Sequence, residues 1–122
     1  VIRMAARSVV AKFSNNTKFD LMLGDSELWH GHWVTSPPSS IAPGAEGQWE
    51  TDSDDYESGT AGDLQYQFTN EEGTQTVRVS WAVPYLGSNN FEVYCEAAGV
   101  RPGYTGGGQD TNATVNYYLN QA

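Results

Sequence analysis

The sequence predicts an all-β protein, a single-domain antiparallel β-sandwich. Apolar and polar residues alternate with a period of two in six segments, as in strands that are buried on one face. Turn-forming residues separate these segments, and no stretch of ten residues carries a capped helical stripe. Because each strand has one apolar face, two sheets must pack together to bury it.

The strands are expected at residues 8–13, 17–23, 63–68, 74–82, 90–95 and 112–119, with less regular ones at 28–34 and 47–51. Turns are expected at Asn15-Asn16, Gly24-Asp25, Ser36-Pro37-Pro38, Pro43-Gly44, Glu72-Gly73 and Gly106-Gly107-Gly108. The predicted core-facing residues, in chain order, are Val9, Ala11, Phe13, Phe19, Leu21, Leu23, Leu64, Tyr66, Phe68, Val77, Val79, Trp81, Phe91, Val93, Cys95, Ala113, Val115, Tyr117 and Leu119.

A chain of 122 residues is long enough for one core. We expect one domain over residues 6–122, after a flexible N-terminus, or residues added to the natural chain, at 1–5. The first residues lack the uninterrupted apolar segment of a secretion signal. We therefore expect synthesis in the cytoplasm, release from the cell, and action at the membrane of a target cell.

The net charge of the chain limits its partners. Fifteen acidic and six basic side chains give a formal charge of −9, and the basic residues form no stripe. Nucleic acid is therefore not an expected partner, because binding its phosphates needs clustered Lys and Arg. Anionic membranes attract basic segments, so an acidic protein that binds lipid is expected to prefer zwitterionic headgroups.

The sequence presents no catalytic arrangement, so we expect neither an enzyme nor a cofactor. Cys95 is the single cysteine and reads as a small core residue, and no serine lies in a nucleophile motif. On one strand, His30 and His32 would point the same way and could share a metal, but a catalytic zinc needs a third ligand and the chain has no other histidine. The acidic segment 50–57 does not have calcium-loop spacing and reads as a solvated loop.

Several aromatic residues lie where strands are expected to end. In WAVPYLGSNN, Pro84 ends the strand of Trp81, so Tyr85 and Leu86 leave the sheet. Trp29 and Trp33 flank the His-Gly-His step, where a glycine can mark a bulge that changes the register. We expect at least two of Trp29, Trp33 and Tyr85 to line one site at an end of the sandwich, suited to a sugar or a choline-like headgroup.

Read in order, these motifs resemble the aegerolysin family, most closely the small component of bacterial binary insecticidal crystal toxins. The resemblance spans residues 6–119. It is carried by Asn15-Asn16-Thr17, Gly31-His32-Trp33, Thr35-Ser36-Pro37, Gly59-Thr60-Ala61-Gly62 and Pro84-Tyr85-Leu86-Gly87-Ser88-Asn89.

The resemblance implies an actinoporin-like β-sandwich that recognises membrane lipids, in several members sphingolipids, and acts with a larger pore-forming partner. That division of work agrees with the strand pattern, because the sandwich core uses the one apolar face of every strand. Oligomerisation on the membrane is compatible with this role. The candidate lipid-headgroup site joins the positions that match the family's lipid-binding motifs with adjacent residues and with the aromatic and apolar residues expected at strand ends. Its members are Trp29, His30, Gly31, Trp33, Glu57, Ser58, Tyr85 and Leu86.

Two other functions stay open at the level of sequence. Aromatic rings beside Asp and Asn also suit a soluble carbohydrate-binding module, and His30 with His32 would be the starting point for a metal-dependent hydrolase. Asn15-Asn16-Thr17 and Asn112-Ala113-Thr114 match the glycosylation acceptor pattern, which is common by chance.

Overall fold

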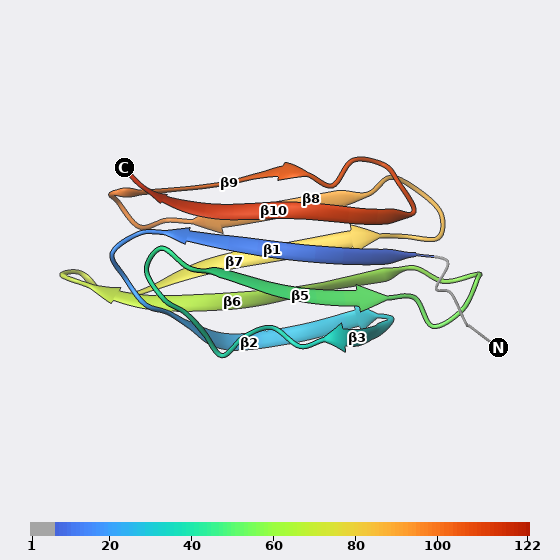
Figure 1. Ribbon diagram of the computed structural model, residues 1–122, viewed down its shortest axis with the longest axis horizontal. Helices are drawn as coiled ribbons and strands as arrows, with labels where there is room; N and C mark the ends of the chain where they lie inside the picture. The colour runs from blue at the N-terminus through green and yellow to red at the C-terminus, as the bar shows by residue number, and fades with distance from the viewer. Residues whose placement is uncertain (1–6) are drawn as a thin grey trace.

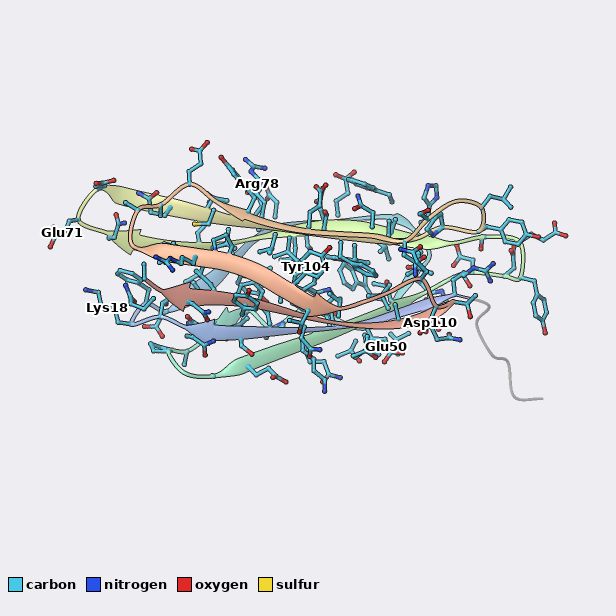
Figure 2. The ribbon with its side chains drawn as sticks, turned by 90° about the horizontal axis from the view of Figure 1, so that it is seen from above. Lys18, Glu50, Glu71, Arg78, Tyr104 and Asp110 are labelled. Atoms are coloured by element: carbon cyan, nitrogen blue, oxygen red, sulfur yellow. The ribbon has the colours of Figure 1, made fainter. Side chains whose placement is uncertain are left out.

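The computed structural model describes residues 7–122, which form two five-stranded sheets packed face to face (Figures 1 and 2). The predicted β-sandwich is confirmed; the expected flexible segment 1–5 lies outside the described residues. The strands are β1 (Ser8–Asn16), β2 (Leu21–His30), β3 (His32–Thr35), β4 (Ser40–Ile41), β5 (Glu46–Asp52), β6 (Thr60–Asn70), β7 (Gly73–Val83), β8 (Asn90–Cys95), β9 (Val100–Gly106) and β10 (Asn112–Gln121).

Sheet A has the strand order β3-β5-β1-β10-β9, and sheet B has the order β4-β2-β6-β7-β8. Neighbouring strands are antiparallel with one exception: β1 and β10 pair in parallel, with Val9 opposite Ala113. A hairpin imposes antiparallel pairing on consecutive strands, but it places no such constraint on strands that lie far apart in the sequence. Strictly antiparallel sheets were therefore an oversimplification.

The core lies between the two sheets and contains most of the alternate residues that the sequence pattern predicts. It also includes five residues that the pattern did not assign to it, Ile41, Trp49, Val83, Ala97 and Val100, whereas the predicted residues Phe19, Leu23, Val93 and Cys95 are only partly buried. Its largest fully buried side chains are aromatic and come from both sheets: Trp49, Trp81, Tyr66 and Tyr117. The rings of Trp49 and Tyr117 stack at 6.2 Å with an angle of 9° between their planes. Cys95 is half-buried against this core, and burial raises the pKa of its thiol.

Two strands escaped prediction, and in both cases the sequence lacks the period-two pattern. β4 has only two residues, which is too short for any alternation to be visible. β9 contains Pro102 and Gly103, which disfavour a strand; it lies at the edge of sheet A, where a missing N–H is tolerated. The predicted segment 28–34 is divided between the end of β2 and all of β3, which belong to different sheets.

Asn15 holds the turn between β1 and β2 and is fully buried. Its side-chain amide donates hydrogen bonds to the carbonyls of Phe19 (2.7 Å) and Ile41 (2.9 Å). Its side-chain oxygen accepts from the backbone N–H of Thr17 (3.1 Å) and from the Thr17 hydroxyl (2.7 Å). All of its hydrogen-bonding capacity is used in the fold, so this triplet serves the turn rather than presenting a glycan acceptor.

Asn15→Ala is expected to lower the free energy of unfolding by about 2 kcal/mol, because it leaves buried backbone groups without partners. Its neighbour Asn16 is the matched control, since its side chain is exposed and donates to the side chain of Asn120 (2.8 Å). Urea unfolding followed by circular dichroism measures both variants. Equal, small losses for the two alanine variants would contradict this role for Asn15.

Candidate functional site

Two adjacent loops at one end of the sandwich carry exposed apolar side chains. They are residues 53–59, between β5 and β6, and residues 84–89, between β7 and β8; together we call them the rim (right-hand end of Figure 1). Tyr56 is 80% exposed, Leu86 81% and Tyr85 41%. An apolar side chain left in water forgoes a favourable transfer, so a cluster of three at one end indicates a contact surface.

Gly59 brings the two rim loops into direct contact. A Cβ atom at this position would lie 2.6 Å from the carbonyl oxygen of Val83, 2.7 Å from Cα of Pro84 and 2.8 Å from the backbone nitrogen of Tyr85. Only a residue without a side chain allows this approach. The loop that contains Glu57 and the loop that contains Tyr85 therefore lie side by side, as the site prediction requires.

Arg7 joins the rim from the start of β1. Its guanidinium carbon lies 5.4 Å from the centre of the Tyr85 ring, and Nη2 donates to the Tyr85 carbonyl at 3.3 Å. Backbone bonds hold Arg7 in place, because its carbonyl accepts from the N–H of Ser53 at 2.9 Å. Sequence reasoning missed both Arg7 and Tyr56, since an isolated arginine and a tyrosine in an acidic run carry no distinguishing pattern.

Asp55 shapes the acidic part of the rim. Its carboxylate accepts from the backbone N–H of Glu57 at 2.9 Å, and its own N–H donates to the Ser58 hydroxyl at 3.2 Å. These local bonds form an Asx-type turn that projects Tyr56 and Glu57 outward. The predicted solvated loop 50–57 is confirmed only over residues 54–57, which are exposed; residues 50–52 belong to β5, and Thr51 and Ser53 are buried.

Gly59→Ala is expected to cost about 1–3 kcal/mol of stability, because the new methyl group meets backbone that cannot rotate away. It should also shift the NMR signals of the Tyr85 and Leu86 amides. Gly24→Ala is the matched control, since a Cβ there finds its nearest neighbour at 3.4 Å and the backbone has no positive φ. Unchanged signals for residues 84–86 in the Gly59 variant would contradict this account of the rim.

The premise that His30 and His32 share one strand is wrong. Gly31 turns the chain with φ of +92°, so His30 ends β2 in sheet B and His32 begins β3 in sheet A. A Cβ on Gly31 would clash with the backbone oxygen of Asp52, which explains the glycine. His32 instead lies between two carboxylates, with Nε2 against Asp52 and Nδ1 3.0 Å from Asp54. Among residues 7–122, no group of three or more His, Cys, Asp or Glu side chains is placed to hold a metal ion.

A buried hydrogen-bonded chain lies beneath the rim and joins the two sheets. The indole N–H of Trp81 donates to the Thr51 hydroxyl at 3.2 Å, and the hydroxyls of Thr51 and Thr60 are 2.8 Å apart. The Thr60 hydroxyl donates to the carbonyl of His30 at 3.2 Å. Because a hydroxyl group both donates and accepts, every polar group in this series has a hydrogen-bond partner. The series fixes the strand ends that carry the rim.

The structure places Trp29, Trp33 and Tyr85, of which at least two were expected to share one site, in three different surroundings. Trp33 is half-buried, and its ring packs against Trp81 with 5.8 Å between centroids, so it belongs to the edge of the core. Tyr85 lies in the rim. Trp29 is 53% exposed and lines a groove of about 250 Å³ on the outer face of sheet B, with no lining residue from either rim loop.

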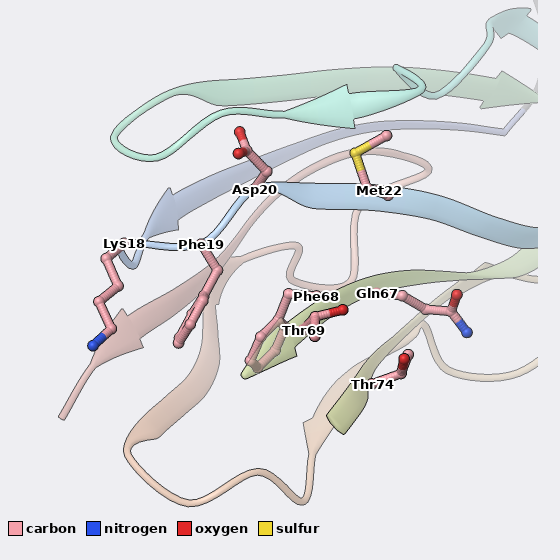
Figure 3. Close-up of a pocket in the computed structure, with 8 residues that line it drawn as sticks. All are labelled: Lys18, Phe19, Asp20, Met22, Gln67, Phe68, Thr69 and Thr74. Atoms are coloured by element: carbon pink, nitrogen blue, oxygen red, sulfur yellow. The ribbon is translucent and has the colours of Figure 1, made fainter. Parts of the chain in front are cut away.

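A hollow that the sequence did not predict lies at the end opposite the rim. It has a volume of about 500 Å³ and is lined from β2, β6, β7 and the turn before β2 (Figure 3). The ring of Phe19 stacks on Phe68 at 4.7 Å, and Nζ of Lys18 lies 5.5 Å from the centre of the Phe19 ring. The stacked rings of Phe19 and Phe68 therefore form one wall of the hollow.

Comparison with known proteins supports the architecture. No model of a known protein family matches the chain, and no curated protein matches it. A crystal structure of the lipid binding protein Nakanori is similar, with a TM-score of 0.83 and 14% identity over 97% of this chain and 73% of that one. The structure of RahU protein in complex with a TRIS molecule is also similar, with a TM-score of 0.72 and 16% identity over 98% of each chain. At these identities the likeness establishes a shared fold.

Residues 7–122 contain no helix that could cross a membrane.

Proposed function

We propose that this protein recognises zwitterionic membrane lipids through the rim. The observation that carries the proposal is the exposure of Tyr56, Tyr85 and Leu86 on two loops that touch each other. An aromatic ring offers about 150–250 Å² of surface, worth about 4–6 kcal/mol if it were buried completely. Partial insertion of each side chain into the bilayer would still contribute about 1–2 kcal/mol to the free energy of binding.

The charges of the rim fit a zwitterionic headgroup. Arg7 provides a guanidinium beside the Tyr85 ring, which suits a lipid phosphate. The carboxylates of Asp54, Asp55 and Glu57 lie on the neighbouring loop, where a headgroup ammonium would find partners. An anionic headgroup would instead meet these carboxylates, and an overall charge of −9 adds to the repulsion.

We further propose an aegerolysin-type role in which this chain provides targeting and a larger chain forms the pore. Among residues 7–122, the apolar inner face of each sheet is used by the core, which disfavours insertion of a strand pair into a bilayer. This supports a division between a lipid-binding component and a pore-forming partner, of the kind found in two-component cytolysins and insecticidal toxins. The protein would reach the target membrane after release from the producing cell.

Vesicle sedimentation tests the proposal. Vesicles of phosphatidylcholine, of sphingomyelin with cholesterol, and of ceramide phosphoethanolamine with cholesterol are compared with vesicles rich in phosphatidylserine. We expect sedimentation with at least one zwitterionic composition, less with phosphatidylserine, and no dye release from vesicles by this chain alone. Failure to bind any of the zwitterionic vesicles would overturn the proposal of lipid recognition. Dye release by this chain alone would overturn the need for a partner.

A further inference from the structure

The outer face of sheet B carries two grooves that the lipid proposal does not use. Each has a volume of about 250 Å³, and they share one residue, Arg78 on β7. Figure 2 places Arg78 on this outer face, away from the core. The first groove contains Trp29, Asp63, Gln65, Ser80 and Glu92, and the second contains Thr74, Gln75, Thr76, Tyr94 and Glu96.

Each groove has one exposed aromatic side chain. Trp29 is 53% exposed and Tyr94 is 55% exposed. Alternation along β8 turns Tyr94 away from the core, and its hydroxyl donates to the Glu96 carboxylate at 3.0 Å, which orients the ring. An aromatic ring on a polar sheet face offers a flat apolar platform at its surface.

The polar groups of the grooves are those that bind hydroxyl groups. Carboxylates accept two or more hydrogen bonds, a glutamine amide donates and accepts, and a guanidinium donates in a fork. A sugar ring needs this combination, because one of its faces is rich in C–H groups and its rim carries hydroxyls in all directions. Asp63, Gln65 and Arg78 line the first groove together with Trp29.

The charge of this face selects among sugars. The two grooves are lined by three carboxylates, from Asp63, Glu92 and Glu96, and by one guanidinium, from Arg78. Burial and the neighbouring carboxylate of Glu27 raise the pKa of Asp63, and Arg78 only partly offsets them. An acidic sugar would add a like charge, whereas a neutral or amino-bearing sugar would not.

We propose that the outer face of sheet B binds a neutral or amino-bearing oligosaccharide, with one sugar ring against Trp29, another against Tyr94, and Arg78 between them. Three strand spacings separate β2 from β8, which is about 14 Å at about 4.8 Å each. A single sugar ring cannot span that distance, so the ligand must be an oligosaccharide. This site is independent of the rim.

A glycan array with neutral, amino-bearing and uronic acid oligosaccharides identifies the probe, and titration followed by NMR and tryptophan fluorescence measures its affinity. We expect hits among neutral or amino-bearing glycans and none among uronic acids. A trisaccharide of the type identified on the array should bind with at least about tenfold higher affinity than the monosaccharide from which it is built. Trp29→Ala and Tyr94→Ala should each weaken binding at least about tenfold.

Met22→Ala is the matched control, since Met22 is an exposed apolar residue on the same strand as Trp29 and lies outside both grooves. This variant and a Tyr85→Ala/Leu86→Ala variant should bind the glycan as the wild type does, which separates this site from the rim. An array without neutral or amino-bearing hits would overturn the proposal. Glycan binding that survives the combined loss of Trp29 and Tyr94, or a monosaccharide that binds as tightly as the trisaccharide, would also overturn it.

Discussion

Replacing both Tyr85 and Leu86 with alanine is expected to weaken binding to zwitterionic vesicles about 100-fold while the protein stays folded. Each side chain contributes about 1–2 kcal/mol on partial insertion, and every 1.4 kcal/mol corresponds to about tenfold in affinity. Leu86 is 81% exposed, so its loss costs the folded state little. Tyr85 is 41% exposed, and its ring contact with Arg7 is worth about 0.5–1 kcal/mol at such a position, so its loss is a modest cost.

Sedimentation with the zwitterionic vesicles that bind the wild type measures this effect. Met22→Ala removes an exposed apolar side chain at the opposite end of β2 and should bind those vesicles normally. Tyr56→Ala should show an intermediate loss, because Tyr56 lies on the adjoining rim loop. A double variant that folds normally and sediments as the wild type does would remove the rim from lipid recognition.

Trp81→Ala is expected to lower the free energy of unfolding by about 3–5 kcal/mol, a large part of the stability of a small domain. Trp81 is buried between Trp33 and Trp49, with ring centroids 5.8 and 5.6 Å away. The substitution leaves a cavity at the centre of the aromatic core. It also removes the donor to Thr51, which begins the hydrogen-bonded chain under the rim.

Two phenylalanine variants keep this prediction decisive if the alanine variant fails to fold. Trp81→Phe and Trp49→Phe remove similar volumes from neighbouring buried positions. The indole N–H of Trp49 has no acceptor among residues 7–122, whereas that of Trp81 bonds to Thr51. We therefore expect Trp81→Phe to cost about 1 kcal/mol more in urea unfolding. Equal costs would mean that the Thr51 hydrogen bond contributes nothing to stability.

The core strands could be predicted because alternation depends only on which face of a strand is buried. Val77, Val79 and Trp81 repeat every second residue and are all buried. The turn after β7 could also be predicted, since Pro84 has no N–H to continue the hydrogen bonds between strands. β9 was not readable, because Pro102 and Gly103 are tolerated only through its position at a sheet edge, which tertiary structure alone defines.

The candidate site was harder to predict because it depends on how strands from distant segments are placed. The register shift between Leu23 and Ser26 turned Leu28 toward the core and Trp29 to the outer face of sheet B. The turn at Gly31 then placed Trp33 at the core edge. The pairing of Thr60 with Val83 brought the Glu57 and Tyr85 loops together. No local sequence pattern encodes either result.

The parallel pairing of β1 with β10 has a consequence for how the chain folds. The hairpins of sheet B join consecutive segments such as β6 and β7, so they can form early and locally. Sheet A cannot close until residues near position 9 meet residues near position 113, across almost the whole polypeptide. Such long-range closure belongs to the slow, millisecond-to-second regime of β proteins. Until β10 arrives, the part of sheet B that it covers, where the Tyr117 hydroxyl bonds to the Ser80 carbonyl, stays exposed, and association with other unfolded chains competes with folding.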